Sequence, residues 1–307
     1  MGVYTKEHFV PQSYLLPFIC SDKKCCVYDK VTKKMFYAST YDICSKRNMY
    51  DLSFNGLDIE PPIGFDPKMN EKLLGIIDGF YPNILEFISS NDSGIDFSTN
   101  FSIRFEIYRF LAVQLFRTPK GKEILLSVLK GKCSTIPEQL ENALFTKELI
   151  NTISVEKPPI VMEFLMQEYG HICVGINISD KPLITSDLPI VGIGDSTSSY
   201  LFLPITPKKC LFFKPTIIIE KQDDIVLQEF LSGKIDISMV EIPKVAYERQ
   251  KQLFMEKNPL TIELSEKEVL LYNSYSYANC QRQIISSSEI IENETFIEID
   301  FNSISNK

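Results

Sequence analysis

Residues 98–119, STNFSIRFEIYRFLAVQLFRTP, are the stretch that decides the fold. Apolar side chains recur almost all round the helix that this stretch predicts, between about residues 98 and 116, and such a helix is central and buried. Pro119 opens the next helix. Gln114 and Arg117 lie three residues apart on one face near the end of the buried helix. A buried guanidinium needs an anion, so we expect Arg117 to meet a carboxylate of its own protein, or a ligand phosphate or carboxylate.

The elements around this helix indicate an α+β fold. Residues 24–40 are typical of a β-hairpin, and residues 70–89 predict one amphipathic helix. In the C-terminal half, strand-like segments alternate with Gly, Pro and Asp. We therefore expect an N-terminal hairpin and central helices packed with a C-terminal mixed or antiparallel sheet.

The last part of the chain predicts further helices and a final strand. Residues 242–256 have helical spacing, and Ser265 followed by Glu268 has the spacing of a capping box that opens a helix to about residue 285. Residues 294–301 predict the last strand.

The organisation of the chain favours one domain over two. There is no internal repeat and no low-complexity linker, so residues 1–307 are expected to form a single α+β domain. The alternative is a mainly helical part, 1–155, and a sheet-containing part, 156–307.

Composition limits the classes of function. The 307 residues include 32 Lys plus Arg, 40 Asp plus Glu and only two His, for a net charge of −8. This balance opposes broad, sequence-blind binding to nucleic acid, although a local basic pocket is allowed. The chain shows no signal peptide, no membrane span and no CxxC pair among its eight Cys. We expect a cytoplasmic protein with free, largely buried thiols.

Several polar residues interrupt apolar patterns. His8 lies among apolar residues near two prolines, and a buried, hydrogen-bonded histidine is the simpler interpretation. Glu71 and Asp78 are seven residues apart on one helix face, where they form either a solvated flank or a pair that binds a divalent cation or transfers protons. Asp187 ends an apolar strand, as a functional carboxylate or as an Asx turn. The internal candidates to pair with Arg117 are Glu71, Asp78, Glu106 and Asp187.

In their order along the chain, these interruptions resemble a bacterial family known as domain of unknown function 4238. The likeness runs from about His8 to Ser287. It rests on the following segments: His8 to Leu15 (HFVPQSYL), Val27 to Asp29 (VYD), the Glu71 and Asp78 pair, Gln114 to Pro119 (QLFRTP), Thr185 to Pro189 (TSDLP), and Asn273 with Ala278 and Arg282. Asp78 departs from the glutamate usual in the family. The resemblance implies that His8, Glu71, Asp78, Gln114, Arg117 and Asp187 form one candidate site. It implies no known activity.

Two functions follow from this candidate site. In the first, the protein is a metal-dependent phosphodiester or nucleotide hydrolase, nuclease-like and of a toxin or phage-defence kind. Glu71, Asp78 and Asp187 would hold Mg²⁺ or Mn²⁺, His8 would be the general acid or base, and Arg117, with Gln114 beside it, would stabilise phosphate charge. The substrate would be a nucleotide or nucleic acid.

In the second, the protein is a non-catalytic ligand-sensing or protein-interaction module. Arg117, Asp78 and Asp187 then form a buried ion network around His8, and the signature residues maintain the fold. A third reading is nucleotide-glycosyl or ADP-ribosyl transfer, for which Tyr14 could be the aromatic platform.

Overall fold

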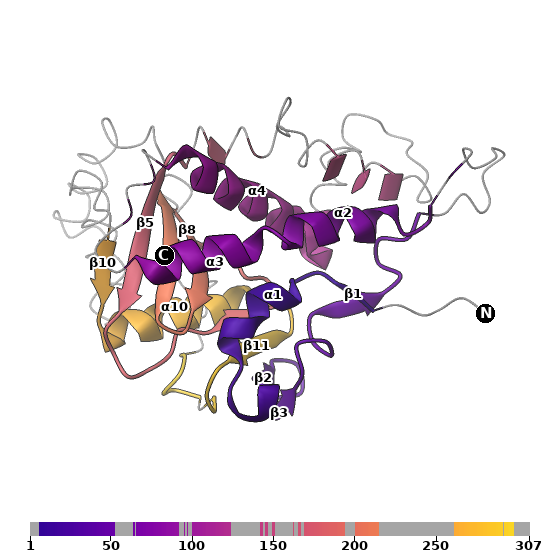
Figure 1. Cartoon of the computed structure of the whole chain (residues 1–307). Coiled ribbons are helices and arrows are strands. Elements are labelled where there is room, and N and C mark those ends of the chain that lie inside the picture. Colours follow the sequence, from indigo (N-terminus) through magenta and orange to yellow (C-terminus); the bar gives the residue numbers. More distant parts are fainter. Residues whose placement is uncertain are drawn as a thin grey trace, which may run out of the picture.

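The structure is a computed structural model that describes residues 6–52, 66–91, 100–123, 169–193, 200–214, 261–290 and 292–297, with single residues and short helical pieces between them. Helices and sheets make up the fold, so the α+β expectation is confirmed (Figure 1). The N-terminal segment contains β1 (Lys6–His8), α1 (Gln12–Leu15) and the 3-10 turns η1 (Leu16–Phe18) and η2 (Ser21–Lys23). Strand β1 pairs antiparallel with β4 (Ser45–Arg47).

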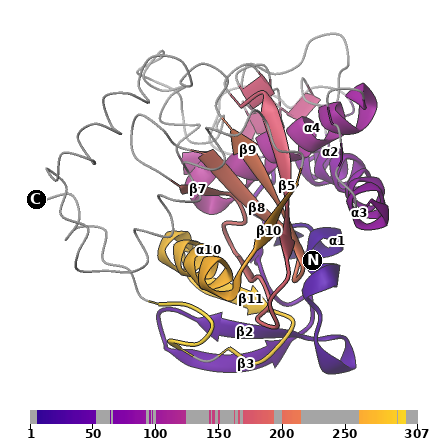
Figure 2. The same cartoon turned by 90° about the vertical axis from the view of Figure 1, so that its left-hand side faces the viewer.

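A five-stranded mixed sheet lies between two layers of helix, with α10 on one face and α2–α4 on the other (Figure 2). Its order is β10 (Thr261–Leu264), β5 (His171–Asn177), β9 (Lys209–Lys214), β8 (Tyr200–Thr206) and β7 (Val191–Ile193). Side chains alternate between the faces. Val174 and Leu211 join the main core beneath α4, whereas Cys173 and Phe212 join a second core with α10.

A four-stranded antiparallel sheet joins the two ends of the chain. Its order is β3 (Lys34–Ala38), β2 (Cys25–Asp29), β11 (Gln283–Ser286) and β6 (Thr185–Ser186). The predicted hairpin of residues 24–40 is therefore confirmed as β2 and β3. Because β11 lies between β2 and β6, a C-terminal strand completes the sheet that the hairpin begins.

The helix predicted over residues 70–89 is two helices, α2 (Met69–Asp78) and α3 (Tyr81–Ser90). Pro82 lies in the first turn of α3, where its missing N–H costs nothing, but it cannot continue a preceding helix. The single-helix prediction was therefore wrong at residues 79–80. Glu71 and Asp78 remain together on α2.

The decisive stretch forms α4 (Phe101–Arg117). From Ile107 onward most of its side chains are buried, whereas Phe101 is 65% exposed. The expectation of burial holds for the C-terminal half of α4 and is wrong for its first turn. The buried half places Gln114 and Arg117 beneath the N-terminal segment.

Helix α10 (Glu266–Asn279) begins at the predicted capping box, in which the backbone N–H of Ser265 donates to Glu268 Oε2 at 2.8 Å. It ends at residue 279, not 285, and residues 283–286 form β11 instead. Lys30 caps this end by donating from Nζ to the carbonyl oxygens of Tyr277 and Ala278 at 2.9 and 3.1 Å.

Two other predictions concern segments that lie wholly or partly outside the described residues. The helix predicted over residues 242–256 lies outside the described residues. Of the last strand, predicted over 294–301, Phe296 makes an isolated bridge with Glu292, and residues 298–301 lie outside the described part. None of the helices in the described ranges combines the length and apolar character needed to span a lipid bilayer.

Candidate functional site

Arg117, at the end of α4, is the centre of the candidate site. Arg117 is 1% exposed, and its guanidinium forms a bidentate ion pair with Asp78, through Nη1 to Oδ1 and through Nη2 to Oδ2 at 3.2 Å. Nη2 also donates to the carbonyl oxygen of His8 at 2.6 Å. Of the four carboxylates expected as partners, Asp78 is the one that pairs with it. Glu106 instead pairs with Arg109 at 3.0 Å.

Gln114 lies one turn before Arg117 and contacts the next residue of the N-terminal segment. Its Nε2 donates to the carbonyl oxygen of Phe9 at 2.9 Å. The side chains three residues apart on α4 therefore hold two consecutive carbonyl groups, those of His8 and Phe9. This pairing explains why the two residues occur at that spacing: both face the same strand end.

His8 presents its backbone to Arg117 and its imidazole elsewhere. Nε2 donates to the carbonyl oxygen of Tyr41 at 3.1 Å, and because a carbonyl only accepts, this nitrogen carries the proton. Burial lowers the pKa of His8, the charge of Arg117 lowers it further, and the bond to Tyr41 offsets only part of this. The imidazole is therefore neutral at pH 7. The simpler interpretation, a buried and hydrogen-bonded histidine, describes this geometry.

Glu71 is the least satisfied carboxyl group of the site. Its Oε2 is buried and has no hydrogen-bond partner among the described residues. Burial and the nearby charge of Glu7 raise the pKa of Glu71 to about 7, against the opposing effect of Arg117. Near neutral pH this side chain is divided between its protonated and ionised forms.

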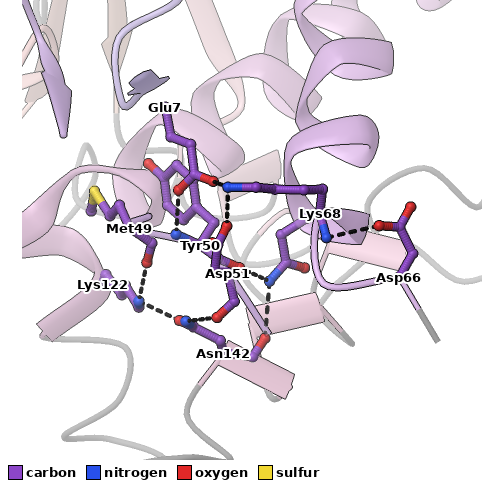
Figure 3. Close-up of polar contacts among 9 residues, drawn as sticks. Glu7, Met49, Tyr50, Asp51, Asp66, Lys68, Lys122 and Asn142 are labelled. Atoms are coloured by element: carbon purple, nitrogen blue, oxygen red, sulfur yellow. Dashed lines mark hydrogen bonds and ion pairs between the residues drawn. The ribbon is translucent and has the colours of Figure 1, made fainter. Parts of the chain in front are cut away.

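A neighbouring polar cluster, Glu7 with Asp51 and Lys68, was missed by the sequence reasoning (Figure 3). Glu7 is fully buried, and its Oε1 accepts from Lys68 Nζ at 2.9 Å while Oε2 accepts from the Tyr50 N–H at 2.7 Å. Lys68 Nζ also donates to Asp51 at 2.5 Å. Glu7 stands in the polar stretch Lys6–His8, so no apolar pattern around it signalled burial.

The ionisation of this cluster follows from its packing. Burial raises the pKa of Glu7, and the neighbouring Asp51 raises it further, although Lys68 and the Tyr50 N–H act in the opposite direction. Burial lowers the pKa of Lys68, but its bonds to Asp51 and Glu7 outweigh burial, and the net shift is upward. Lys68 is therefore held as a cation between two carboxyl groups.

Tyr50 joins this cluster to Arg117. Its hydroxyl donates to the carbonyl oxygen of Arg117, while its own carbonyl accepts from Asn70 at 2.9 Å. Asn142 continues the network by donating to the Asp51 carbonyl oxygen at 2.6 Å, and Lys122 donates to Asn142 and, at 2.9 Å, to the carbonyl oxygen of Met49 (Figure 3). Most of these bonds join a side chain to the main chain of a distant segment.

Asp187 belongs to a different part of the molecule. Its carboxylate accepts the backbone N–H groups of Gln281, Arg282 and Gln283 at 2.9, 2.7 and 3.0 Å. Burial raises the pKa of Asp187, and these three bonds lower it in part. Its hydrogen bonds fix the start of β11, and none reaches His8, Asp78 or Arg117.

The geometry does not support a cation site formed by Glu71, Asp78 and Asp187. In the ranges that the structure describes, no group of three or more His, Cys, Asp or Glu side chains is arranged to hold a metal ion. Asp78 is engaged by Arg117, and Asp187 by main-chain amides. Glu71 remains as a single carboxyl group.

A comparison with known families shows which family the chain belongs to. A family model described as "Protein of unknown function (DUF4238)" matches residues 6–289, nearly the whole chain. The chain belongs to this family. No curated protein and no solved structure matches it.

Within this DUF4238 chain, the other residues that carried the resemblance also connect segments. The hydroxyl of Tyr14, which is fully buried, donates to the Pro204 carbonyl oxygen at 2.6 Å and contacts Thr185 Oγ1 at 2.8 Å. It is therefore no exposed platform for a nucleotide. Asn273 accepts from the Ile184 N–H at 3.0 Å and donates to the Pro182 carbonyl oxygen at 2.9 Å.

Proposed function

We propose that this DUF4238 protein is a non-catalytic ligand-sensing or protein-interaction module, in which the signature residues maintain the fold. One observation carries the proposal. Arg117 is buried, and its two terminal nitrogens bond to Asp78 and to the main chain of His8, whereas its Nε has no partner among the described residues. A group that is buried and already paired is poorly placed to meet a substrate phosphate.

The same pattern extends over the molecule. Gln114, Tyr14, Asn273 and Asp187 each bond to the backbone of a segment far away in sequence. These contacts support a structural role for the motif residues. In the described part of the chain Cys25, Cys26, Cys44 and Cys280 are free thiols, which supports the further proposal that the protein works in the reducing cytoplasm.

The test is a hydrolysis screen on purified protein. Single- and double-stranded DNA, RNA and nucleotides are incubated with Mg²⁺ or Mn²⁺, and products are separated by chromatography. We expect no turnover above a no-protein blank. Turnover that His8→Ala abolishes, in a variant that unfolds at the wild-type temperature, would falsify the proposal.

A second candidate, phosphodiester or nucleotide hydrolysis, is favoured by one observation. Glu71 has an unpaired buried oxygen and a pKa of about 7, beside the Arg117–Asp78 pair. A carboxyl group with such a pKa is suited to proton transfer at neutral pH. In this reading Glu71 is the general acid or base, and a nucleotide or nucleic acid is the substrate.

The same screen separates the two candidates when Glu71→Gln is compared with Glu86→Gln. Glu86 is an exposed residue of α3, so its substitution controls for loss of a helix carboxylate. If the second candidate is right, wild type and Glu86→Gln hydrolyse a substrate. Glu71→Gln should then be at least about 100-fold less active than either, because a general acid or base usually contributes at least that factor. Equal activity in all three proteins contradicts it.

A further inference from the structure

Strand β3 is an exposed edge of the four-stranded sheet (Figure 2). It pairs with β2 over five consecutive residues without a register shift, from Lys34 to Ala38. Its other edge has no strand partner among the described residues. Such an edge offers a row of backbone N–H and C=O groups for pairing with another strand.

Both faces of β3 are apolar at its centre. Phe36 is opposite Val27, a residue of the main core, and Met35 and Tyr37 are opposite residues of the third core on the other face. Met35, Phe36 and Tyr37 are nevertheless 37%, 39% and 50% exposed. Proteins usually protect an edge with charged side chains, especially lysine, with proline or with a bulge. Lys34 stands at the start of β3, but its centre, Met35 to Tyr37, has none of these.

We propose that β3 pairs antiparallel with β3 of a second copy of this chain, which joins two sheets across a two-fold axis at Phe36. The proposal rests on the proposed function, since it names the partner of an interaction module. The sequence KMFYA is self-complementary in this register: Phe36 meets Phe36 on one face, and Met35 meets Tyr37 twice on the other. Aromatic pairs and sulfur–aromatic contacts directly across strands are stabilising.

Charge selects the antiparallel arrangement. Lys34 opens β3, and the carboxylate of Asp42, which pairs with Lys6 of its own chain at 2.6 Å, follows its end. Antiparallel pairing directs Lys34 of one copy towards the Asp42 end of the other. The two Lys34 residues are then separated by four strand positions, about 13 Å at the usual rise, which exceeds the screening length of about 8 Å in physiological salt. A parallel pairing would place them side by side.

The first test measures association of the full chain by sedimentation equilibrium from about 1 μM to about 1 mM, which covers weak to moderate affinities. We expect wild type to form a concentration-dependent dimer. Phe36→Glu should weaken it at least about tenfold, since two carboxylates would be opposed on a pairing strand. Phe101→Glu changes a more exposed phenylalanine on α4 and should leave association unchanged.

A second test fixes the register. Directly opposed residues of antiparallel strands have Cα atoms about 4.5–5.5 Å apart, within the range of a disulfide. Phe36→Cys should therefore form a covalent dimer under a mild added oxidant, whereas Phe101→Cys should give no more than the background of the native thiols. Circular dichroism confirms that each variant is folded.

Two outcomes overturn the inference. One is a wild-type protein that stays monomeric over the whole concentration range. This outcome overturns the inference even if an acidic peptide binds at β3. The other is a dimer that Phe36→Glu and Phe101→Glu affect equally. Hydrolysis in the earlier screen would remove the proposed function and leave the dimer measurement intact, so the two failures are distinguishable.

Discussion

Arg117 illustrates how one residue can be tied to segments far away in sequence. Its bonds reach Asp78 and the carbonyl of His8, which lie 39 and 109 positions earlier in the chain. A buried guanidinium is stable only while its charge is compensated. The Arg117–Asp78 pair is therefore a point at which a single substitution should have a large effect.

We predict that Asp78→Asn lowers the free energy of unfolding by about 2–3 kcal/mol, because it leaves Arg117 buried without a counter-charge. The figure is below that of a fully buried pair because the side chain of Asp78 is 24% exposed. Urea denaturation followed by circular dichroism measures the change. Asp42→Asn removes the exposed partner of Lys6 and should alter stability much less. Equal losses in both variants would contradict the burial argument.

Glu71 should make stability depend on pH. Its pKa is about 7 in the folded protein, above the value of 4.5 of an unperturbed glutamate. The folded state therefore binds the proton more tightly, so this stabilisation is fully present below pH 4.5 and is lost as pH rises through about 7. The free energy of unfolding of wild type should therefore fall between pH 5 and 8. In Glu71→Gln it should fall by about 1 kcal/mol less, a figure reduced for solvent screening.

The measurement is a series of urea titrations at several pH values. Glu86→Gln is the matched control, since it removes an exposed glutamate from α3. Glu7, whose pKa burial also raises, should preserve part of the slope in Glu71→Gln. A wild-type protein whose stability rises over this pH range would refute the assignment to Glu71.

At the scale of elements, close packing between neighbouring strands limits which residues a strand accepts. Gly175 lies in β5 opposite Cys210 of β9. A Cβ atom added there would lie 2.4 Å from Cys210 Sγ and 2.6 Å from a ring carbon of Phe212. Both neighbours are fully buried in the second core, so neither side chain has free space to move.

We therefore expect Gly175→Ala to lower the free energy of unfolding by about 1–3 kcal/mol, the usual cost of overpacking a core. Gly192 is a control in β7 of the same sheet, where an added Cβ meets nothing within 4 Å. Thermal unfolding of the two alanine variants tests this difference. The packing argument fails if Gly192→Ala is destabilised as much as Gly175→Ala.

At the scale of the whole molecule, one core draws on both ends of the chain. The main cluster includes Phe9 and Tyr14 from the N-terminal segment, Leu111 from α4, and Leu211 and Ile285 from the two larger sheets. Strand β11 also completes a sheet begun by residues 25–38. A helical part, 1–155, and a sheet-containing part, 156–307, would each lose core contacts if separated.

We predict one cooperative unfolding transition for the full chain. Far-UV circular dichroism and tyrosine fluorescence should give coincident urea midpoints, and Asp78→Asn should shift both together. Tyrosine is the suitable probe because the chain has no Trp. Two resolved midpoints, only one of which moves in Asp78→Asn, would support two independently folding parts.

The sequence by itself determined the α+β class, the types of several elements and a short set of site candidates. Helix α4, the β2–β3 hairpin and the capping box at Ser265 were predictable because each depends on residues a few positions apart. The need of Arg117 for an anion was also predictable, because burial and charge are properties of the residue and its helix face.

Only the tertiary structure decided which residues meet. It selected Asp78 from four carboxylates, placed Asp187 at the start of β11 and buried Glu7 beside Lys68. These contacts join residues separated by 39 to 96 positions, and their formation depends on how whole elements pack. Local spacing determines the face on which a side chain lies, and packing of distant elements determines what that face meets.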